Sequence, residues 1–428
     1  MTHTIAPAPA GRLTAAQGTA MYVGAVLGTG VIALPALAAE KAGPASLLAW
    51  LALVVLSAPL AAVFAALGAR HPDAGGVSTY ARLAFGERAA AVVGWCFYLA
   101  VPPGATAAAL FCGAYVSAAA GGGTAVTVGT AVALMAAVAA ANAAGLRVTG
   151  RLQLAMAGLL VTLLLIAVAL SLPQARLENL QPFAPHGWTA VGPAAALLVW
   201  SFAGWEAITH LAAEFRRPER DLPRAAMAAV AVVGVLYLSV AFATVAVLGP
   251  GAADTQAPLG ELMAAGLGGN ARIPAAAAAL LLTFGTMNAY YASAAKLGAA
   301  LGRDGALPRW LARGSVAGEV PRRSLGAVAA LSFLAMGAVA VSGTGPEPLV
   351  LLTTGSFVAV YAVGTAAALR LLPRGRMRLA ALVSLAAVVV LLVMSGVYLL
   401  WPLLVTGAAL LYLRLRARRG RTALRSAR

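Results

Sequence analysis

Charged residues are scarce in this sequence. Asp, Glu, Lys and Arg make up 10% of its 428 residues, hydrophobic residues make up 61%, and the mean hydropathy is +0.89. Soluble domains carry about 25% charged residues, so the composition excludes an ordinary soluble protein. Several runs of about 20 residues lack any formal charge, which is enough helix to cross a hydrocarbon layer of roughly 30 Å. Because no charged face recurs along these runs, we expect membrane-spanning helices rather than interfacial helices or a barrel.

Cysteine is nearly absent. Cys96 and Cys112 are the only cysteines, and both fall in one apolar run. The helix between them would hold them roughly 24 Å apart, whereas a disulfide needs Cα atoms within about 7 Å. Neither cysteine has metal-ligand spacing or a neighbouring base. We therefore expect both to pack as small apolar side chains, and we expect no metal and no cofactor.

The sequence also lacks the motifs that mark ATP-driven transporters, intramembrane enzymes and ion channels. No Gly-rich loop ends in Gly-Lys-Ser/Thr, so a built-in ATP motor is not expected. Neither HExxH nor GxSxG occurs, which argues against an intramembrane protease or acyltransferase, and no catalytic residue is assigned. Repeated filter sequences or rings of charge, which would support a channel, are not visible.

What the sequence does have is a regular series of apolar runs, which predicts an all-α integral membrane protein with twelve transmembrane helices. We divide it into two five-helix repeats and two further helices. The expected regions are a tail at 1–16, a first repeat at 17–172, a second at 189–372, helices 11 and 12 at 379–413, and a basic tail at 414–428. The expected spans are 17–38, 44–69, 89–120, 124–144, 152–172, 189–212, 224–248, 272–300, 324–342, 347–369, 379–395 and 397–413.

The basic residues are distributed unevenly between the two sides of these spans. If both tails lie on one side, that side holds all of the 30 Lys and Arg residues except Lys41, Arg176, Arg272 and Lys296. The positive-inside bias makes this side cytoplasmic, so both termini are expected there. The net charge of +17 therefore reflects topology rather than nucleic-acid binding. The Arg-rich tail is interpreted as a topology anchor, with contact to anionic lipid headgroups as the alternative. Abundant Arg, Ala and Gly suggest a bacterial, GC-rich source.

The first span carries weak helix formers near mid-depth. Its stretch "GAVLGTGVIALP" holds Gly24, Gly28, Gly30 and Pro35. Glycines at spacing four, such as Gly24 and Gly28, also make close helix contacts, so a packing role is one interpretation. Unwinding is the other, because Gly30 and Pro35 follow and the sixth span shows a similar interruption. An unwound segment frees backbone N–H and C=O groups that lipid cannot satisfy, so it must face protein, water or a ligand.

The sixth span contains the matching interruption. It reads "VWSFAGWEAITHLAAE" and holds Ser201, Gly204 and an ionisable Glu206 about 15 Å of helix from Arg216. The two interruptions lie in the first and sixth spans, so they enter from opposite sides and any repeat between them is inverted. A half-helix N-terminus offers donors to a carboxylate, and freed carbonyls offer acceptors to an ammonium. An α-amino acid carries both groups.

The sequence resembles the amino acid-polyamine-organocation (APC) superfamily of permeases. The resemblance rests on four motifs in order, namely "GTGVIALP" at 28–35, "RHPDAGGVSTYARLAFGERAAAVVGW" at 70–95, "WSFAGWE" at 200–206 with "EFRRPERDLPRA" after it, and "KLGAALGRDGALP" at 296–308. It covers roughly residues 17–310 well, and it is closest to the bacterial branch that exports methionine and branched-chain amino acids. Thr29 replaces the serine of the family's Gly-Ser-Gly motif and keeps a hydroxyl.

The resemblance implies a set of substrate-binding residues in both interruptions. Gly28, Thr29 and Gly30, with Val26 beside them, would bind the carboxylate. Carbonyls around Ser201, Phe202 and Ala203 would accept from the ammonium, and Trp200 would cover the substrate as an aromatic gate. Tyr290 in the eighth span and Ser356 in the tenth are candidates for the same pocket.

Glu206 is the principal candidate for coupling. A mid-membrane carboxyl is costly unless it is protonated or paired, so a compensating role is expected. Glu206 could link transport to protons or sense the substrate-bound state, hold the unwound first span by hydrogen bonds, or contact the substrate directly. His210 could relay a proton to Glu206 or be an ordinary hydrogen-bonded side chain, and His210 with Glu214 does not complete a metal shell. Lys296 is expected to reach the cytoplasmic face. The fifth span has no lysine, which weakens lysine-based coupling.

The resulting expectation is a secondary carrier with alternating access, not an enzyme. Its expected substrates are the neutral L-amino acids methionine, leucine, isoleucine and valine, with proton-linked efflux across the cytoplasmic membrane. Proton-driven uptake and amino acid exchange stay open as alternatives. Sodium coupling would need hydroxyls of Thr283, Thr286 and Ser293 to converge. The partners are then an amino acid, protons and membrane lipids, and the oligomeric state is left open.

Overall fold

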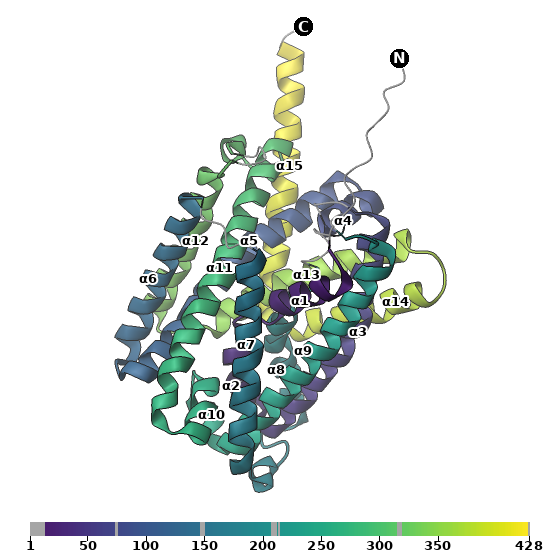
Figure 1. The fold of residues 1–428 in the computed structure, drawn as a ribbon. Helices are drawn as coiled ribbons and strands as arrows, with labels where there is room; N and C mark the ends of the chain where they lie inside the picture. Colours follow the sequence, from purple (N-terminus) through teal and green to yellow (C-terminus); the bar gives the residue numbers. More distant parts are fainter. Residues whose placement is uncertain are drawn as a thin grey trace.

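The chain folds into a bundle of helices. A computed structural model describes residues 13–72, 76–145, 150–206, 212, 215–314 and 319–426 (Figure 1). Its α-helices are α1 Ala15–Val26, α2 Gly30–Ala42, α3 Ser46–Arg70, α4 Val77–Phe85, α5 Glu87–Ala120, α6 Gly123–Ala143, α7 Gly150–Ser171, α8 Val191–Leu198, α9 Pro218–Leu248, α10 Pro258–Leu267, α11 Arg272–Asp304, α12 Arg322–Ser342, α13 Glu347–Leu371, α14 Arg376–Met394 and α15 Leu400–Ser426. Within the described ranges, the only β-type pairing is an isolated bridge between Leu13 and Phe215.

The all-α integral membrane fold is confirmed. Nine helices among the described residues are long and apolar enough to cross a membrane. The count of twelve crossings stays a prediction, because the apolar helices Gly158–Gln174 and Trp188–Phe202 are shorter than a full span and α1 is not among the nine. The division into repeats and tails likewise stays a prediction.

Burial differs strongly between the spanning helices. In α5, 89% of the most apolar window is buried, whereas in α14 and the last spanning segment the value is 17%. Exposed Leu and Val side chains cover these outer helices, as at Val393 and Leu404. Such apolar exposure suits contact with lipid chains. Helix α5 is therefore the centre of the bundle, and α14 and α15 are peripheral.

Two short helices were not expected from the apolar runs. Helix α4 packs against α5 and α13, and α10 packs against α7, α9 and α11. Each has ten residues or fewer, so neither produces a run of spanning length. Both lie in connections between the long helices.

Several of the helices fall into two groups. Helices α5, α6, α11 and α12 pack against one another and are called the α5 group, and α1, α2, α3, α8 and α9 do the same and are called the α9 group (Figure 1). Helix α13 contacts both α5 and α3. Within the α5 group, Asn142 Nδ2 donates a buried 2.7 Å hydrogen bond to Asn288 Oδ1. Helices α7 and α10 likewise contact members of both groups, so the seam between the two groups is bridged at several places.

Candidate functional site

The first interruption separates α1 from α2. The last regular bond of α1 runs from Leu27 N–H to the Val23 carbonyl at 2.8 Å, and Gly28 N–H then donates to the Val26 carbonyl at 2.7 Å. Helix α2 starts at Gly30. The first N–H groups of a helix have no partner within it and carry partial positive charge. The unwinding predicted here is confirmed, and it points the donor end of α2 into the bundle.

The second interruption follows α8. The chain continues as a short 3-10 helix, η5, over Val199–Phe202. Ala203 is then extended, and Gly204 has a φ of +127°, a conformation that favours glycine. The backbone therefore leaves the helical conformation at Ala203, so the carbonyls before it do not continue the regular helical hydrogen-bond pattern. The broken sixth span is thus also confirmed.

The two interruptions touch and run antiparallel. A Cβ atom on Gly30 would lie 2.5 Å from Ser201 Oγ and 3.1 Å from Ser201 Cα. A Cβ atom on Gly204 would lie 2.9 Å from the Ala25 carbonyl oxygen. The earlier residue of one segment therefore meets the later residue of the other, as two oppositely directed segments require. By contrast, a Cβ on Gly28 would meet only Thr286 Cγ2, at 4.0 Å, so Gly28 does not serve tight packing.

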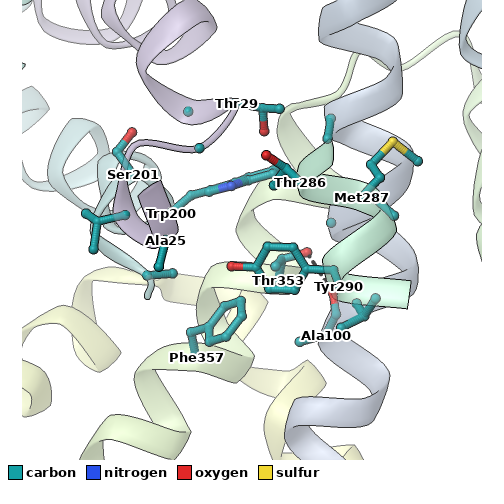
Figure 2. Close-up of a pocket in the computed structure, with 18 residues that line it drawn as sticks. Ala25, Thr29, Ala100, Trp200, Ser201, Thr286, Met287, Tyr290, Thr353 and Phe357 are labelled. Carbon is teal, nitrogen blue, oxygen red and sulfur yellow. Dashed lines mark hydrogen bonds between the residues drawn. The ribbon is translucent and has the colours of Figure 1, made fainter. Parts of the chain in front are cut away.

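A cavity lies beside this contact, on the seam between the two helix groups. It encloses about 570 Å³ of atom-free space, including its part open to solvent. The α9 group contributes both interruptions, the α5 group contributes α5 and α11, and α13 completes the wall (Figure 2). The lining residues are Ala25, Val26, Gly28, Thr29, Gly30, Ala100, Val101, Gly104, Ala105, Ala108, Trp200, Ser201, Ala203, Thr286, Met287, Tyr290, Thr353 and Phe357.

Most of the residues expected to bind substrate lie in this wall. They are Val26, Gly28, Thr29, Gly30, Trp200, Ser201, Ala203 and Tyr290. The Trp200 indole extends across the cavity, and Thr29 and Thr286 also line it (Figure 2). Their role in binding stays a prediction, although the structure brings these side chains together.

Phe202 and Ser356 do not line the cavity. The Phe202 ring packs instead against Trp50 and Tyr237, with centroid distances of 5.9 and 5.1 Å. The Ser356 hydroxyl donates to the Leu352 carbonyl at 3.2 Å. Residues four apart share a helix face, so Thr353 and Phe357 face the cavity and Ser356, one position before Phe357, is turned away from it.

Most of the lining residues from α5, α11 and α13 were not predicted from the sequence. Helix α5 contributes only small or β-branched residues there, and α11 and α13 add larger ones. The lining residues not assigned to substrate binding are Ala25, Ala100, Val101, Gly104, Ala105, Ala108, Thr286, Met287, Thr353 and Phe357. Of these, Thr286 was considered only as a sodium ligand. The repeat of Ala100, Gly104 and Ala108 at spacing four was the available signal, but such stripes usually mark helix packing.

The partial charges in the cavity wall come from backbone groups. None of the described lining residues is charged. The donor end of α2 and the carbonyls after α8 therefore supply opposite partial charges beside an apolar wall. A buried charge is tolerated only when it is paired and hydrogen-bonded. Such a wall can accommodate a small zwitterion with an uncharged side chain.

Glu206 lies behind the wall and not in it. Its side chain is 1% exposed, and its Oε2 atom accepts from Gly204 N–H at 3.1 Å and from the Tyr361 hydroxyl. The Tyr361 oxygen also accepts from Gly204 N–H, at 3.2 Å. These bonds hold the second interruption to α13. The sequence did not reveal Tyr361, because nothing local to its position connects it with Glu206. His210 lies outside the described residues.

The other polar candidates are dispersed. Thr286 lines the cavity and Thr283 is fully buried, but Ser293 is exposed on α11, so the three hydroxyls do not converge on one cation site. Lys296 is also exposed on α11. Cys96 and Cys112 are buried free thiols. In the part of the chain that the structure describes, no cluster of His, Cys, Asp and Glu could hold a metal ion.

Comparison with known proteins agrees with this geometry. A family model described as amino acid permease matches residues 13–425. An uncharacterised amino acid permease of Bacillus subtilis, YecA, is 34% identical over 409 residues, which cover 94% of this chain and 95% of that protein. The L-methionine/branched-chain amino acid exporter YjeH of Escherichia coli is 34% identical over 392 residues, covering 89% and 91%. The branched-chain amino acid permease BcaP of B. subtilis is 27% identical over 245 residues, about half of each chain.

Proposed function

The chain belongs to the amino acid permease family of the APC superfamily, and on that premise we propose that it is a secondary carrier of neutral, hydrophobic L-amino acids. Methionine, leucine, isoleucine and valine are the proposed substrates. The observation that carries the proposal is the meeting of two antiparallel interruptions at a cavity whose described wall is uncharged. As a member of a transporter family the protein is not an enzyme.

The proposed binding pose follows the backbone dipoles. The substrate carboxylate accepts from N–H groups at the start of α2, around Gly28, Thr29 and Gly30. The ammonium donates to carbonyls of the segment from Trp200 to Ala203. The apolar side chain then lies among α5, Met287 and Phe357. An arginine or polyamine side chain would place a further charge against this apolar surface, at a high desolvation cost.

The proposed transport step is a rocking motion of one helix group against the other. The cavity lies on the seam between the α5 and α9 groups, so a change in their angle would open it to one side and then the other. This motion needs no nucleotide hydrolysis. We place both termini in the cytoplasm from the charge bias of the connections.

We propose efflux as the direction and protons as the coupling ion. Efflux is supported by similarity over most of the chain to a protein named as an exporter. Proton linkage is supported by the buried Glu206 carboxyl, which is bonded to the second interruption and therefore positioned to couple its charge state to that segment. Proton-driven uptake and exchange are the alternatives that the assay must separate.

Purified protein in liposomes tests the proposal directly. Radiolabelled leucine and methionine should move across the membrane, an imposed pH gradient should accelerate the flux, and excess arginine should not compete. Replacing sodium by choline should leave the flux unchanged. If neither amino acid moves or exchanges, the substrate assignment is wrong. If flux occurs but ignores the pH gradient, proton coupling is wrong.

A larger side chain at Ala108 should change the preferred substrate. Ala108 lines the cavity from α5, so Ala108→Leu fills part of the space assigned to the substrate side chain. One extra or missing methylene group in an apolar pocket is worth about 1–3 kcal/mol of discrimination. We expect KM for leucine and methionine to rise about tenfold or more, while competition by alanine is retained.

Ala136→Leu is the matched control for this change. Ala136 lies on α6 with its side chain exposed on the outside of the bundle, so the same added volume should leave KM unchanged. Equal KM values for leucine in Ala108→Leu and wild type would argue against α5 as the wall of the side-chain site.

A further inference from the structure

One tyrosine on α9 reaches both interruptions. Tyr237 is fully buried, and its hydroxyl lies 2.8 Å from the Val26 carbonyl oxygen and 2.6 Å from the Ser201 carbonyl oxygen. Val26 is the last residue of α1, and Ser201 lies in η5 just before the chain unwinds. The same hydroxyl therefore donates to a carbonyl of each segment, sharing its single proton between them.

The Val26 and Ser201 carbonyls both lack the N–H donor that a continuous helix would supply. In a continuous helix each carbonyl would accept from an N–H group four residues later. The interruptions remove those donors, and lipid offers no replacement. Gly28 N–H reaches the Val26 carbonyl, but Tyr237 is the donor that serves both segments at once.

The ring of Tyr237 is held as firmly as its hydroxyl. It packs edge-on against Trp50 of α3 and against Phe202 of η5, with both centroid distances at 5.1 Å. Trp50 is also fully buried. Aromatic contacts of this geometry add to the stabilisation from burial alone. Helices α1, α3 and α9 and the segment after α8, all in the α9 group, thus converge on one side chain.

We propose that Tyr237 is a positioning residue that fastens the two unwound segments to each other at a fixed separation. This rests on the proposed function, in which one segment binds the substrate carboxylate and the other its ammonium. A fixed separation between these groups selects α-amino acids, whose two charged groups are one carbon apart. Tyr237 thereby sets specificity for the α-amino acid headgroup without touching the substrate, since it is absent from the described cavity wall.

The test is Tyr237→Phe, which removes the hydroxyl and keeps the ring packing. Leucine uptake into liposomes is measured together with competition by β-leucine, its isomer with the amino group one carbon further from the carboxylate. We expect KM for leucine to rise about tenfold. The ratio of the β-leucine to leucine inhibition constants should fall by a similar factor, which a general loss of activity would not produce.

Tyr98→Phe is the matched control. The Tyr98 hydroxyl is also buried and lies 3.2 Å from the Ser324 carbonyl oxygen, but it joins α5 to α12 within the other helix group. This variant should keep the wild-type inhibition ratio. A wild-type ratio in Tyr237→Phe, or an equal fall of the ratio in Tyr98→Phe, would overturn the proposal.

Backbone hydrogen exchange gives a readout that needs no substrate. In Tyr237→Phe, amides of residues 27–30 and 203–204 should exchange at least about tenfold faster, with rates in α6 and α12 unchanged. If wild type moves neither leucine nor methionine, the proposed function fails, and this exchange measurement still decides the role of Tyr237. Unchanged exchange in both segments would refute it.

A second variant covers the case in which Tyr237→Phe does not fold. Trp50→Phe keeps the Tyr237 hydroxyl but replaces the indole that packs against the Tyr237 ring with a smaller ring. The inhibition ratio and the exchange rates should shift in the same direction by a smaller factor. Wild-type values in folded Trp50→Phe would then count against the proposal.

Discussion

Gly30→Ala should reduce leucine transport by about two orders of magnitude. The added methyl group would lie 2.5 Å from Ser201 Oγ and 3.1 Å from Ser201 Cα. The hydroxyl can rotate, but the Cα atom belongs to the main chain of the second interruption and can move only with that segment. Overpacking of this kind costs about 1–3 kcal/mol. The strain falls on the contact that shapes the proposed site, so we expect transport to be lost while the bundle still folds.

The measurement is initial uptake in liposomes, with folding checked by thermal melting and size-exclusion chromatography. Gly129→Ala is the control, because a Cβ atom at this helical glycine on α6 meets nothing within 4 Å. Gly28→Ala should have a smaller effect than Gly30→Ala, since its methyl group has room beside Thr286. Wild-type transport by Gly30→Ala would show that the close approach of the two segments is dispensable.

Glu206→Ala should reduce transport about 100-fold or more. The change removes the carboxylate oxygen that accepts from both groups, so the Tyr361 hydroxyl loses this acceptor and Gly204 N–H keeps its bond to the Tyr361 oxygen. A buried donor left unsatisfied costs about 1–3 kcal/mol. Because these bonds tie the second interruption to α13, their loss should free that segment rather than unfold the bundle. Tyr361→Phe should act in the same direction with a smaller effect, because Gly204 N–H keeps the carboxylate.

Glu206→Gln separates the two roles considered for this residue. The amide oxygen can accept the same two hydrogen bonds, but the side chain no longer takes up or releases a proton. If Glu206 carries the coupling proton, this variant should exchange leucine at a substantial rate and lose the response of net flux to an imposed pH gradient. Flux that follows the gradient as in wild type would leave Glu206 a structural group only.

The two interruptions were predictable because their causes are local. Gly28, Gly30 and Gly204 are weak helix formers in otherwise strong apolar runs, and glycine tolerates the φ of +127° found at Gly204. An ionisable residue in a membrane span is equally conspicuous, so Glu206 could be singled out from its position alone. Thr29, Trp200 and Ala203 came from the resemblance to the APC superfamily, which implies binding residues in both interruptions, and all three line the cavity.

The rest of the site was not predictable because its causes are distant in the chain. Thr353 and Phe357 of α13 face the cavity while Ser356 does not, a matter of how the helix is rotated against its neighbours. The contact of Tyr361 with Glu206 joins residues 155 positions apart, and that of Tyr237 with Val26 joins residues 211 positions apart. Nothing in the local pattern around either tyrosine distinguishes it from other aromatic residues in apolar helices.

The sequence by itself determined that the chain spans a membrane as helices and where two of those helices unwind. These properties depend on the hydrophobicity and backbone preferences of neighbouring residues, which are readable along the chain. Only the tertiary structure decided that Gly30 meets Ser201, which small side chains of α5 close the cavity, and which hydroxyl serves the freed carbonyls. Those features depend on helix rotation and packing, where the freed backbone groups of one segment must find donors and acceptors elsewhere in the bundle because lipid supplies none.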